Sequence, residues 1–158
     1  MDTQVKKYLA RLRTIYEEIE GWLAEDKQLR IAYKEYSIKE LSSVSYKAPK
    51  LLITDDSGKL VAELIPKGAW VVSAEGLIDI KGEMGIDNLL YLTKNPPITT
   101  HVAVGSQKLW NSPSVYSNIE LEGWYWIDPN SMEPILVEKE LFKELVEQAS
   151  FYEFDSTN

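Results

Sequence analysis

The sequence of 158 residues predicts an α+β protein: a curved antiparallel sheet, built as a meander, with amphipathic N-terminal and C-terminal helices packed on it. Two observations predict this class. Apolar residues recur with helical spacing near both ends of the chain, and short apolar runs separated by turn residues occupy the region between them. We expect roughly six to eight strands. We also expect residues 1–158 to form a single domain, because their number is that of one average domain.

The first predicted element is a helix from about Thr3 to Glu25. Its apolar side chains cover an arc of about 140°, which suits packing on a sheet better than packing in a coiled coil. They are Val5, Tyr8, Leu9, Leu12, Ile15, Tyr16, Ile19, Trp22 and Leu23. We expect Leu12 and Ile19 to be buried against the sheet.

Short strands are predicted next. The segment Asp55–Lys59, with sequence Asp-Asp-Ser-Gly-Lys, is a hairpin turn between two of them. Ser37–Lys50 is polar and ambiguous, and Ser37–Leu41 suits one helical turn. The predicted strands are Leu29–Tyr36, Leu51–Thr54, Leu60–Ile65, Ala69–Ala74, Leu77–Lys81, Leu89–Thr93, Ile119–Leu121 and Trp124–Ile127.

The last third of the chain contains an irregular segment and a second helix. Residues 95–118 contain three prolines and show no stable periodicity, so they are interpreted as a long loop that docks on the domain or on a partner. Leu141, Phe142, Leu145, Val146 and Ala149 form one face of a helix predicted over Glu138–Ser150. Residues 151–158 are expected to be a short tail.

The net charge of −8 excludes some classes of partner. Acidic proteins are repelled by phosphate backbones, which argues against nucleic-acid binding. The chain has no cysteine, which fits a reducing compartment, and no apolar run long enough to cross a bilayer. We therefore expect a cytoplasmic protein that does not bind membranes; the counts say nothing of its oligomeric state.

The sequence contains few marks of catalysis. There is no GxSxG, GxGxxG or GxxxxGK[ST] motif, and His101 is the one imidazole in the chain. No metal site with cysteine or paired histidine ligands can form. The segment Asp55–Gly58 resembles part of a calcium loop but lacks the distal glutamate. We therefore predict no cofactor and no metal, and favour a protein that is not an enzyme.

One set of residues supports a catalytic alternative. Glu63, Asp79 and Lys81 could form a carboxylate-dependent hydrolase or nuclease-like site, because Asp79-Ile80-Lys81 has the acid-to-lysine spacing of PD-(D/E)xK nucleases. Asp55, Asp56 or Glu18 could add a further acid to this set. Residues two apart on a strand share one face of the sheet. However, no Pro-Asp pair precedes this motif, and the predicted sheet is antiparallel. Polar residues on a solvated strand face explain the same pattern.

Aromatic residues are the candidates for binding. Trp110 and Tyr116 lie in the irregular segment, whereas Trp124 and Trp126 lie on one face of a predicted strand. These aromatics either fill the core beneath the helices or form a groove for a peptide, protein or small ligand.

We therefore expect a non-catalytic interaction protein, of an inhibitor-like or immunity-like kind, whose acidic surface suits a basic protein partner. The alternatives are the carboxylate-dependent hydrolase described above and a small-molecule binding module.

Overall fold

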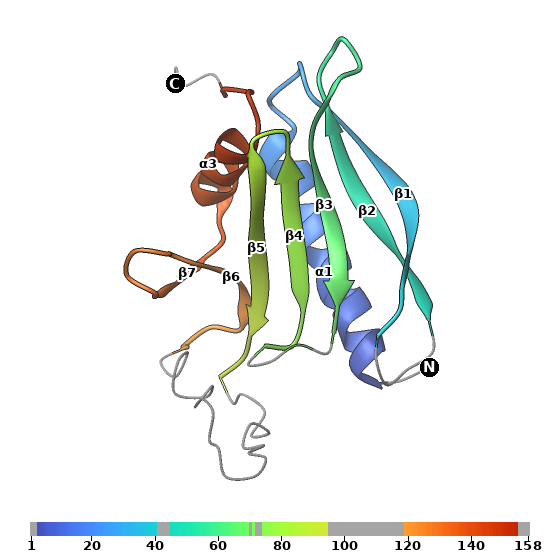
Figure 1. Cartoon of the computed structure of the whole chain (residues 1–158), viewed down its shortest axis with the longest axis vertical. Helices are drawn as coiled ribbons and strands as arrows, with labels where there is room; N and C mark the ends of the chain where they lie inside the picture. Colours follow the sequence, from blue (N-terminus) through green and yellow to red (C-terminus); the bar gives the residue numbers. More distant parts are fainter. Residues whose placement is uncertain (1–2, 41–44, 70, 72–73, 95–118, 155–158) are drawn as a thin grey trace.

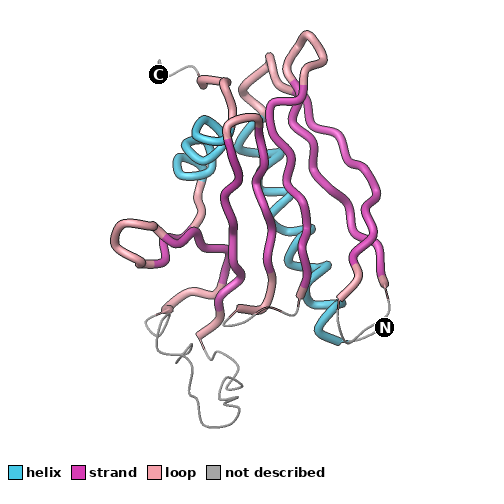
Figure 2. Tube along the Cα trace, in the orientation of Figure 1, coloured by secondary structure: helices cyan, strands magenta, loops and turns pink. Residues whose placement is uncertain are grey.

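The computed structural model describes residues 3–40, 45–69, 71, 74–94 and 119–154. These residues contain one open antiparallel sheet of seven strands, whose spatial order is the chain order (Figure 1, Figure 2). The strands are β1 (Arg30–Ile38), β2 (Tyr46–Thr54), β3 (Leu60–Gly68), β4 (Leu77–Gly82), β5 (Gly85–Leu92), β6 (Gly123–Ile127) and β7 (Pro134–Leu136). The predicted α+β meander is confirmed.

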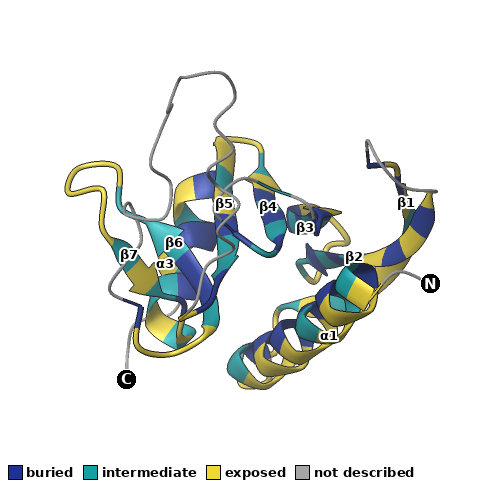
Figure 3. Cartoon of the chain, turned by 90° about the horizontal axis from the view of Figure 1, so that it is seen from below, coloured by how far each residue is buried: buried dark blue, intermediate teal, exposed yellow. Residues whose placement is uncertain are grey.

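Helices α1 (Thr3–Leu23) and α3 (Lys139–Ala149) lie on one face of this sheet (Figure 3). The prediction that Leu12 and Ile19 are buried is confirmed, since they are 1% and 0% exposed. The buried residues of α1 are Val5, Tyr8, Leu12, Ile15, Tyr16, Ile19 and Leu23. Those of α3 are Phe142, Leu145, Val146 and Ala149. Both helices are therefore held by their apolar stripes.

Two tyrosine hydroxyls connect α1 to the sheet. The Tyr8 hydroxyl donates a hydrogen bond to the Leu77 carbonyl oxygen, and the Tyr16 hydroxyl donates one to the Pro49 carbonyl oxygen, both at 2.8 Å. Burial raises the pKa of both hydroxyls above the ordinary value for tyrosine. Both side chains therefore stay neutral and hydrogen-bonded at physiological pH.

The two faces of the sheet differ in polarity. The inner face, beneath the helices, carries Leu51, Ile53, Ala62, Leu64, Ile78, Ile80 and Leu89. The outer face carries the alternate residues Leu52, Glu63, Ile65, Asp79, Lys81 and Asn88. A smaller apolar cluster lies on the outer face at β5 and β6 and consists of Ala74, Leu92, Ile119 and Tyr125.

The predicted hairpin turn at Asp55–Lys59 is confirmed. The Asp55 carboxylate accepts hydrogen bonds from the backbone N–H groups of Ser57 and Lys59, each at 2.9 Å. These bonds, together with one from the Ser57 hydroxyl, lower the pKa of the Asp55 carboxyl. Gly58 has a φ of 88°, a backbone conformation that glycine adopts without strain. The chain thus reverses here by local chemistry alone.

Several predicted boundaries are wrong. The described part of Ser37–Leu41, which ends at Glu40, is not a helical turn, because β1 continues to Ile38. Strand β2 begins at Tyr46 instead of Leu51. Much of β1 is solvent-exposed on both faces, so its sequence lacks the apolar alternation that marks a strand.

Among the described residues, two of the predicted strands do not form strands of the sheet, and one strand was not foreseen. Within Ala69–Ala74, the described residues Val71 and Ala74 form an isolated bridge. Ile119–Leu121 is irregular, although Ile119 is buried. The unforeseen β7 has three residues, too few for a periodic signal, and pairs with β6.

The remaining expectations concern the irregular segment, the tail and the membrane. Residues 95–118, with His101, Trp110 and Tyr116, lie outside the described residues, as do residues 155–158 of the tail. The described part of the tail is docked, because the Phe154 N–H donates a 2.7 Å hydrogen bond to the Glu147 carboxylate. None of the helices among the described residues has the length and apolarity needed to cross a bilayer.

Candidate functional site

A cleft of about 610 Å³ opens between α1 and the β6–β7 end of the sheet. One wall is the stripe of α1 formed by Arg11, Thr14, Ile15, Glu18 and Trp22. The last four of these residues follow Arg11 by three, four, seven and eleven positions, so all five share one side of the helix. The other lining residues are Tyr91, Glu122, Gly123, Trp124, Leu136, Val137, Glu138 and Lys139. The cleft thus brings together residues from both ends and the middle of the chain.

Arg11 is held firmly at one end of the cleft. Its Nη1 lies 2.8 Å from Glu75 Oε1, and its guanidinium lies 4.2 Å from the centre of the Tyr91 ring. Burial raises the pKa of the Tyr91 hydroxyl, and the positive charge of Arg11 partly opposes this. The side chains of Arg11 and Glu75 are each 18% exposed, so the ion pair lies at the boundary between core and solvent.

Three aromatic residues, which we call the cleft aromatics, are Trp22, Tyr91 and Trp124. The rings of Tyr91 and Trp124 meet edge to face, with centroids 5.3 Å apart. Trp124 is 5% exposed and forms the floor, whereas Trp22 is partly exposed and packs on Phe142 at 5.7 Å. The cleft therefore offers an apolar base of the kind that ligand and peptide sites use.

Three glutamates, which we call the cleft carboxylates, are Glu18, Glu122 and Glu138. Glu18 lies on α1, while Glu122 and Glu138 flank the place where the Val137 N–H bonds to the Trp124 carbonyl oxygen at 3.0 Å. All three are exposed, and within the described residues none of them takes part in an ion pair. The walls of the cleft therefore carry unmatched negative charge.

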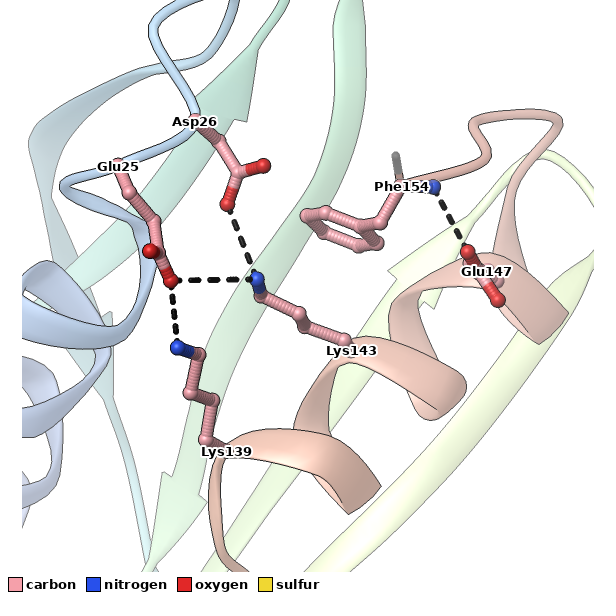
Figure 4. Close-up of polar contacts among 6 residues, drawn as sticks. All are labelled: Glu25, Asp26, Lys139, Lys143, Glu147 and Phe154. Carbon is pink, nitrogen blue, oxygen red and sulfur yellow. Dashed lines mark hydrogen bonds and ion pairs between the residues drawn. The ribbon is translucent and has the colours of Figure 1, made fainter. Parts of the chain in front are cut away.

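An ion-pair cluster lies where the chain leaves α1 and where α3 begins (Figure 4). Lys139 Nζ lies 2.5 Å from Glu25 Oε2, and Lys143 Nζ lies 3.2 Å from Asp26 Oδ2. The hydrogen bond from Lys139 lowers the pKa of the Glu25 carboxyl, and the same bond raises the pKa of Lys139. Lys139 lines the cleft, but its charge is matched by Glu25 and not by the cleft carboxylates.

The structure brings Glu63, Asp79 and Lys81 onto the outer face of adjacent strands. Glu63 and Lys81 are partners in the β3–β4 register. Each acid already has a partner: Lys50 Nζ lies 3.0 Å from Glu63 Oε1, and Asn88 Nδ2 donates to Asp79 Oδ1 at 2.7 Å. Among the described residues no group of three or more histidine, cysteine, aspartate or glutamate side chains could hold a metal ion.

The aromatic candidates lie in three different environments. Trp124 lines the cleft and is nearly buried. Trp126 lies on the same face of β6 but outside the cleft, and its Nε1 donates to Asp87 Oδ1 at 3.2 Å. Trp110 and Tyr116 lie outside the described residues.

Sequence reasoning missed most of the cleft. It assigned Trp22 to the apolar stripe of the first helix, and it considered Glu18 only as an addition to the Glu63, Asp79 and Lys81 set. It gave no binding role to Arg11, Glu122 or Glu138. The helical spacing between Arg11 and Trp22 was the one available signal. The two glutamates at the ends of the β6–β7 hairpin carry no such spacing, so nothing local distinguished them from other surface acids.

Comparisons of the chain with protein-family models, with curated proteins and with solved structures find no match. The residues of the cleft are therefore the ground on which a function can be argued.

Proposed function

We propose that this protein is a non-catalytic interaction protein that binds a basic segment of a partner protein in the cleft between α1 and the β6–β7 hairpin. The observation that carries the proposal is the combination of aromatic floor and unmatched acidic walls. The two cations that line the cleft, Arg11 and Lys139, are matched by Glu75 and Glu25. The cleft carboxylates thus remain available for positive charge brought by a partner.

The net charge of the whole chain has the same sign as the unmatched charge of the cleft. A net charge of −8 accelerates encounters with basic partners and slows encounters with acidic ones. Local and global charge thus have the same sign. An inhibitor-like or immunity-like role is one in which a small acidic protein binds a basic one, and it agrees with this arrangement.

The environment of Glu63 and Asp79 on the outer face of the sheet argues against a catalytic role. Glu63 and Asp79 are occupied by Lys50 and Asn88, and a metal-dependent hydrolase needs carboxylates that are open to the ion. A small-molecule binding module is the second candidate, because a cleft of about 610 Å³ falls within the usual size range of small-ligand sites.

Isothermal titration calorimetry with a basic probe tests the proposal. The probe is an eight-residue peptide of alternating arginine and lysine with blocked ends, and its glutamate counterpart is the negative control. We expect binding of the basic peptide that weakens as NaCl is raised, and no binding of the acidic peptide. If the basic peptide does not bind at low salt, the proposal is wrong.

Matched variants separate the cleft from general charge attraction. In one triple variant the cleft carboxylates are replaced, as Glu18→Gln, Glu122→Gln and Glu138→Gln. In the control variant, the exposed acids Glu17, Glu120 and Glu144, which do not line the cleft, are replaced by glutamine. Each variant loses three negative charges, so the two variants have the same net charge. We expect at least about tenfold weaker binding for the cleft variant and about twofold for the control; equal weakening would exclude the cleft as the site.

A further inference from the structure

We infer that the group recognised in the cleft is an arginine side chain, presented by an extended segment of the partner that lies along α1. The inference rests on the proposed function and names its recognition element. It depends on three features of the cleft: its shape, its aromatic residues and the placement of its carboxylates on both walls.

The shape of the cleft suits an extended segment. Its α1 wall spans residues 11–22, which at 1.5 Å per residue is about 16 Å. An extended chain advances about 3.3 Å per residue, so about five residues span this length. The other wall is formed by β6, β7 and the first residue of α3. A segment of this length can lay one side chain on the aromatic floor while its backbone follows the helix.

One arginine of the protein already has the surroundings that we infer for the arginine of the partner. Arg11 stacks on Tyr91 at 4.2 Å and pairs with Glu75 at 2.8 Å, so its guanidinium is bound by one ring and one carboxylate. The cleft offers the same two kinds of group again: Trp22 is partly exposed beside Glu18, one helical turn away on α1. A second guanidinium would find there the surroundings that Arg11 already has.

The cleft carboxylates favour arginine over lysine. Glu18 lies on one wall, and Glu122 and Glu138 lie on the other. A guanidinium is planar, stacks on aromatic rings and spreads five donors in its plane, so it can contact a ring and more than one carboxylate oxygen at the same time. An ammonium group is a compact point charge that is strongly hydrated, and it gains less from an aromatic floor.

Three peptides with one changed side chain test this inference by calorimetry. Each is a five-residue peptide of glycine and serine with blocked ends, and its central residue is arginine, lysine or citrulline. Citrulline keeps the planar shape without the charge. We expect the arginine peptide to bind at least about fivefold more tightly than the lysine peptide, and the citrulline peptide to bind at least about twentyfold more weakly than the arginine peptide.

A substitution in the cleft tests the aromatic contribution. Trp22→Leu should reduce the preference for arginine over lysine to less than about twofold, whereas Trp22→Phe keeps a ring and should retain most of it. Phe151→Leu is the control, because Phe151 is a large aromatic residue that is 69% exposed and lies outside the cleft. Circular dichroism melts confirm that each variant is folded. An unchanged preference in folded Trp22→Leu would overturn the inference.

The outcomes separate this inference from the proposed function. Equal binding of arginine and lysine peptides would overturn the inference while leaving the binding of basic segments intact. If neither these peptides nor the alternating arginine–lysine peptide binds, the proposed function fails as well. Binding of arginine amide as tightly as the arginine peptide would also overturn the inference, since it would mean that the cleft binds a small cation and not a protein segment.

Discussion

The indole Nε1 of Trp124 donates a hydrogen bond to the backbone carbonyl oxygen of Arg11 at 3.2 Å. The two residues are 113 positions apart, one on β6 and the other on α1. The same indole packs edge to face on Tyr91, the ring on which the Arg11 guanidinium stacks. A single side chain thus ties the helix to the sheet and forms the floor of the cleft.

Replacing this indole should weaken the fold. Trp124→Phe removes the Nε1 donor and leaves space under α1, so we expect it to lower the free energy of unfolding by about 1–3 kcal/mol. Urea unfolding followed by circular dichroism measures the change. Trp126→Phe is the control, because Trp126 is partly exposed; it should cost less than about 1 kcal/mol. A larger loss in the control would contradict the role that we give to Trp124.

Gly82 is predicted to be intolerant of any side chain. A Cβ atom at this position would lie 2.1 Å from the Ala149 carbonyl oxygen, which also accepts a 2.8 Å hydrogen bond from the Met84 N–H. Gly82→Ala should therefore displace the end of α3 and lower the free energy of unfolding by about 1–3 kcal/mol.

Gly21→Ala is the matched control for this substitution. Gly21 lies within α1, and a Cβ there would meet nothing within 4 Å. Because alanine favours the helix, the control should raise stability by about 0.5–1 kcal/mol. Thermal melts of the two variants should therefore shift in opposite directions. A Gly82→Ala variant that is as stable as the unchanged protein would show that α3 is not packed against the β4–β5 hairpin in this way.

The protein should lose stability at alkaline pH. Burial raises the pKa values of Tyr8 and Tyr16 above the ordinary value of 10.0. A group whose pKa is raised in the folded state contributes its full stability below its unfolded pKa and loses it as pH rises further. The free energy of unfolding should therefore fall above about pH 10. Urea unfolding at pH 8 to 12 measures this fall, and absorbance at 295 nm should show the buried tyrosines ionising together with unfolding.

A tyrosine variant checks the cause of this alkaline effect. Tyr16→Phe removes the bond to the Pro49 carbonyl oxygen, so it should cost about 1 kcal/mol at pH 7. It should also reduce the loss of stability above pH 10, since one ionising group is gone. An unchanged alkaline slope would mean that other groups and not Tyr16 set the pH dependence.

The outer-face acids should not bind divalent metal tightly. Glu63 and Asp79 are already engaged by Lys50 and Asn88. Calorimetric titration with Mg²⁺ and with Mn²⁺ should show no binding in the micromolar range, and Asp79→Asn should leave the titration unchanged. Micromolar binding that disappears in Asp79→Asn would restore the hydrolase alternative.

Much of the fold could be predicted because it is encoded by local periodicity. The stripe that buries Leu12 and Ile19 repeats with the period of a helix, and the Asp55–Lys59 turn has its own hydrogen-bonding chemistry. Prediction was less complete where this signal is weak: the strand predicted at Leu29–Tyr36 is present as β1 but continues to Ile38, and β7, which has three residues, was not foreseen.

The cleft could not be predicted, because it depends on neighbours that are distant in the sequence. Arg11 meets Glu75 and Tyr91 when α1 crosses the sheet, and Glu138 comes near α1 when the chain returns through β7. Periodicity reports which side of an element faces the core, because burial of apolar surface selects it. It does not report which element lies opposite that side. That choice depends on the packing of the whole chain, and it is this packing that collects the cleft aromatics and the cleft carboxylates into one site.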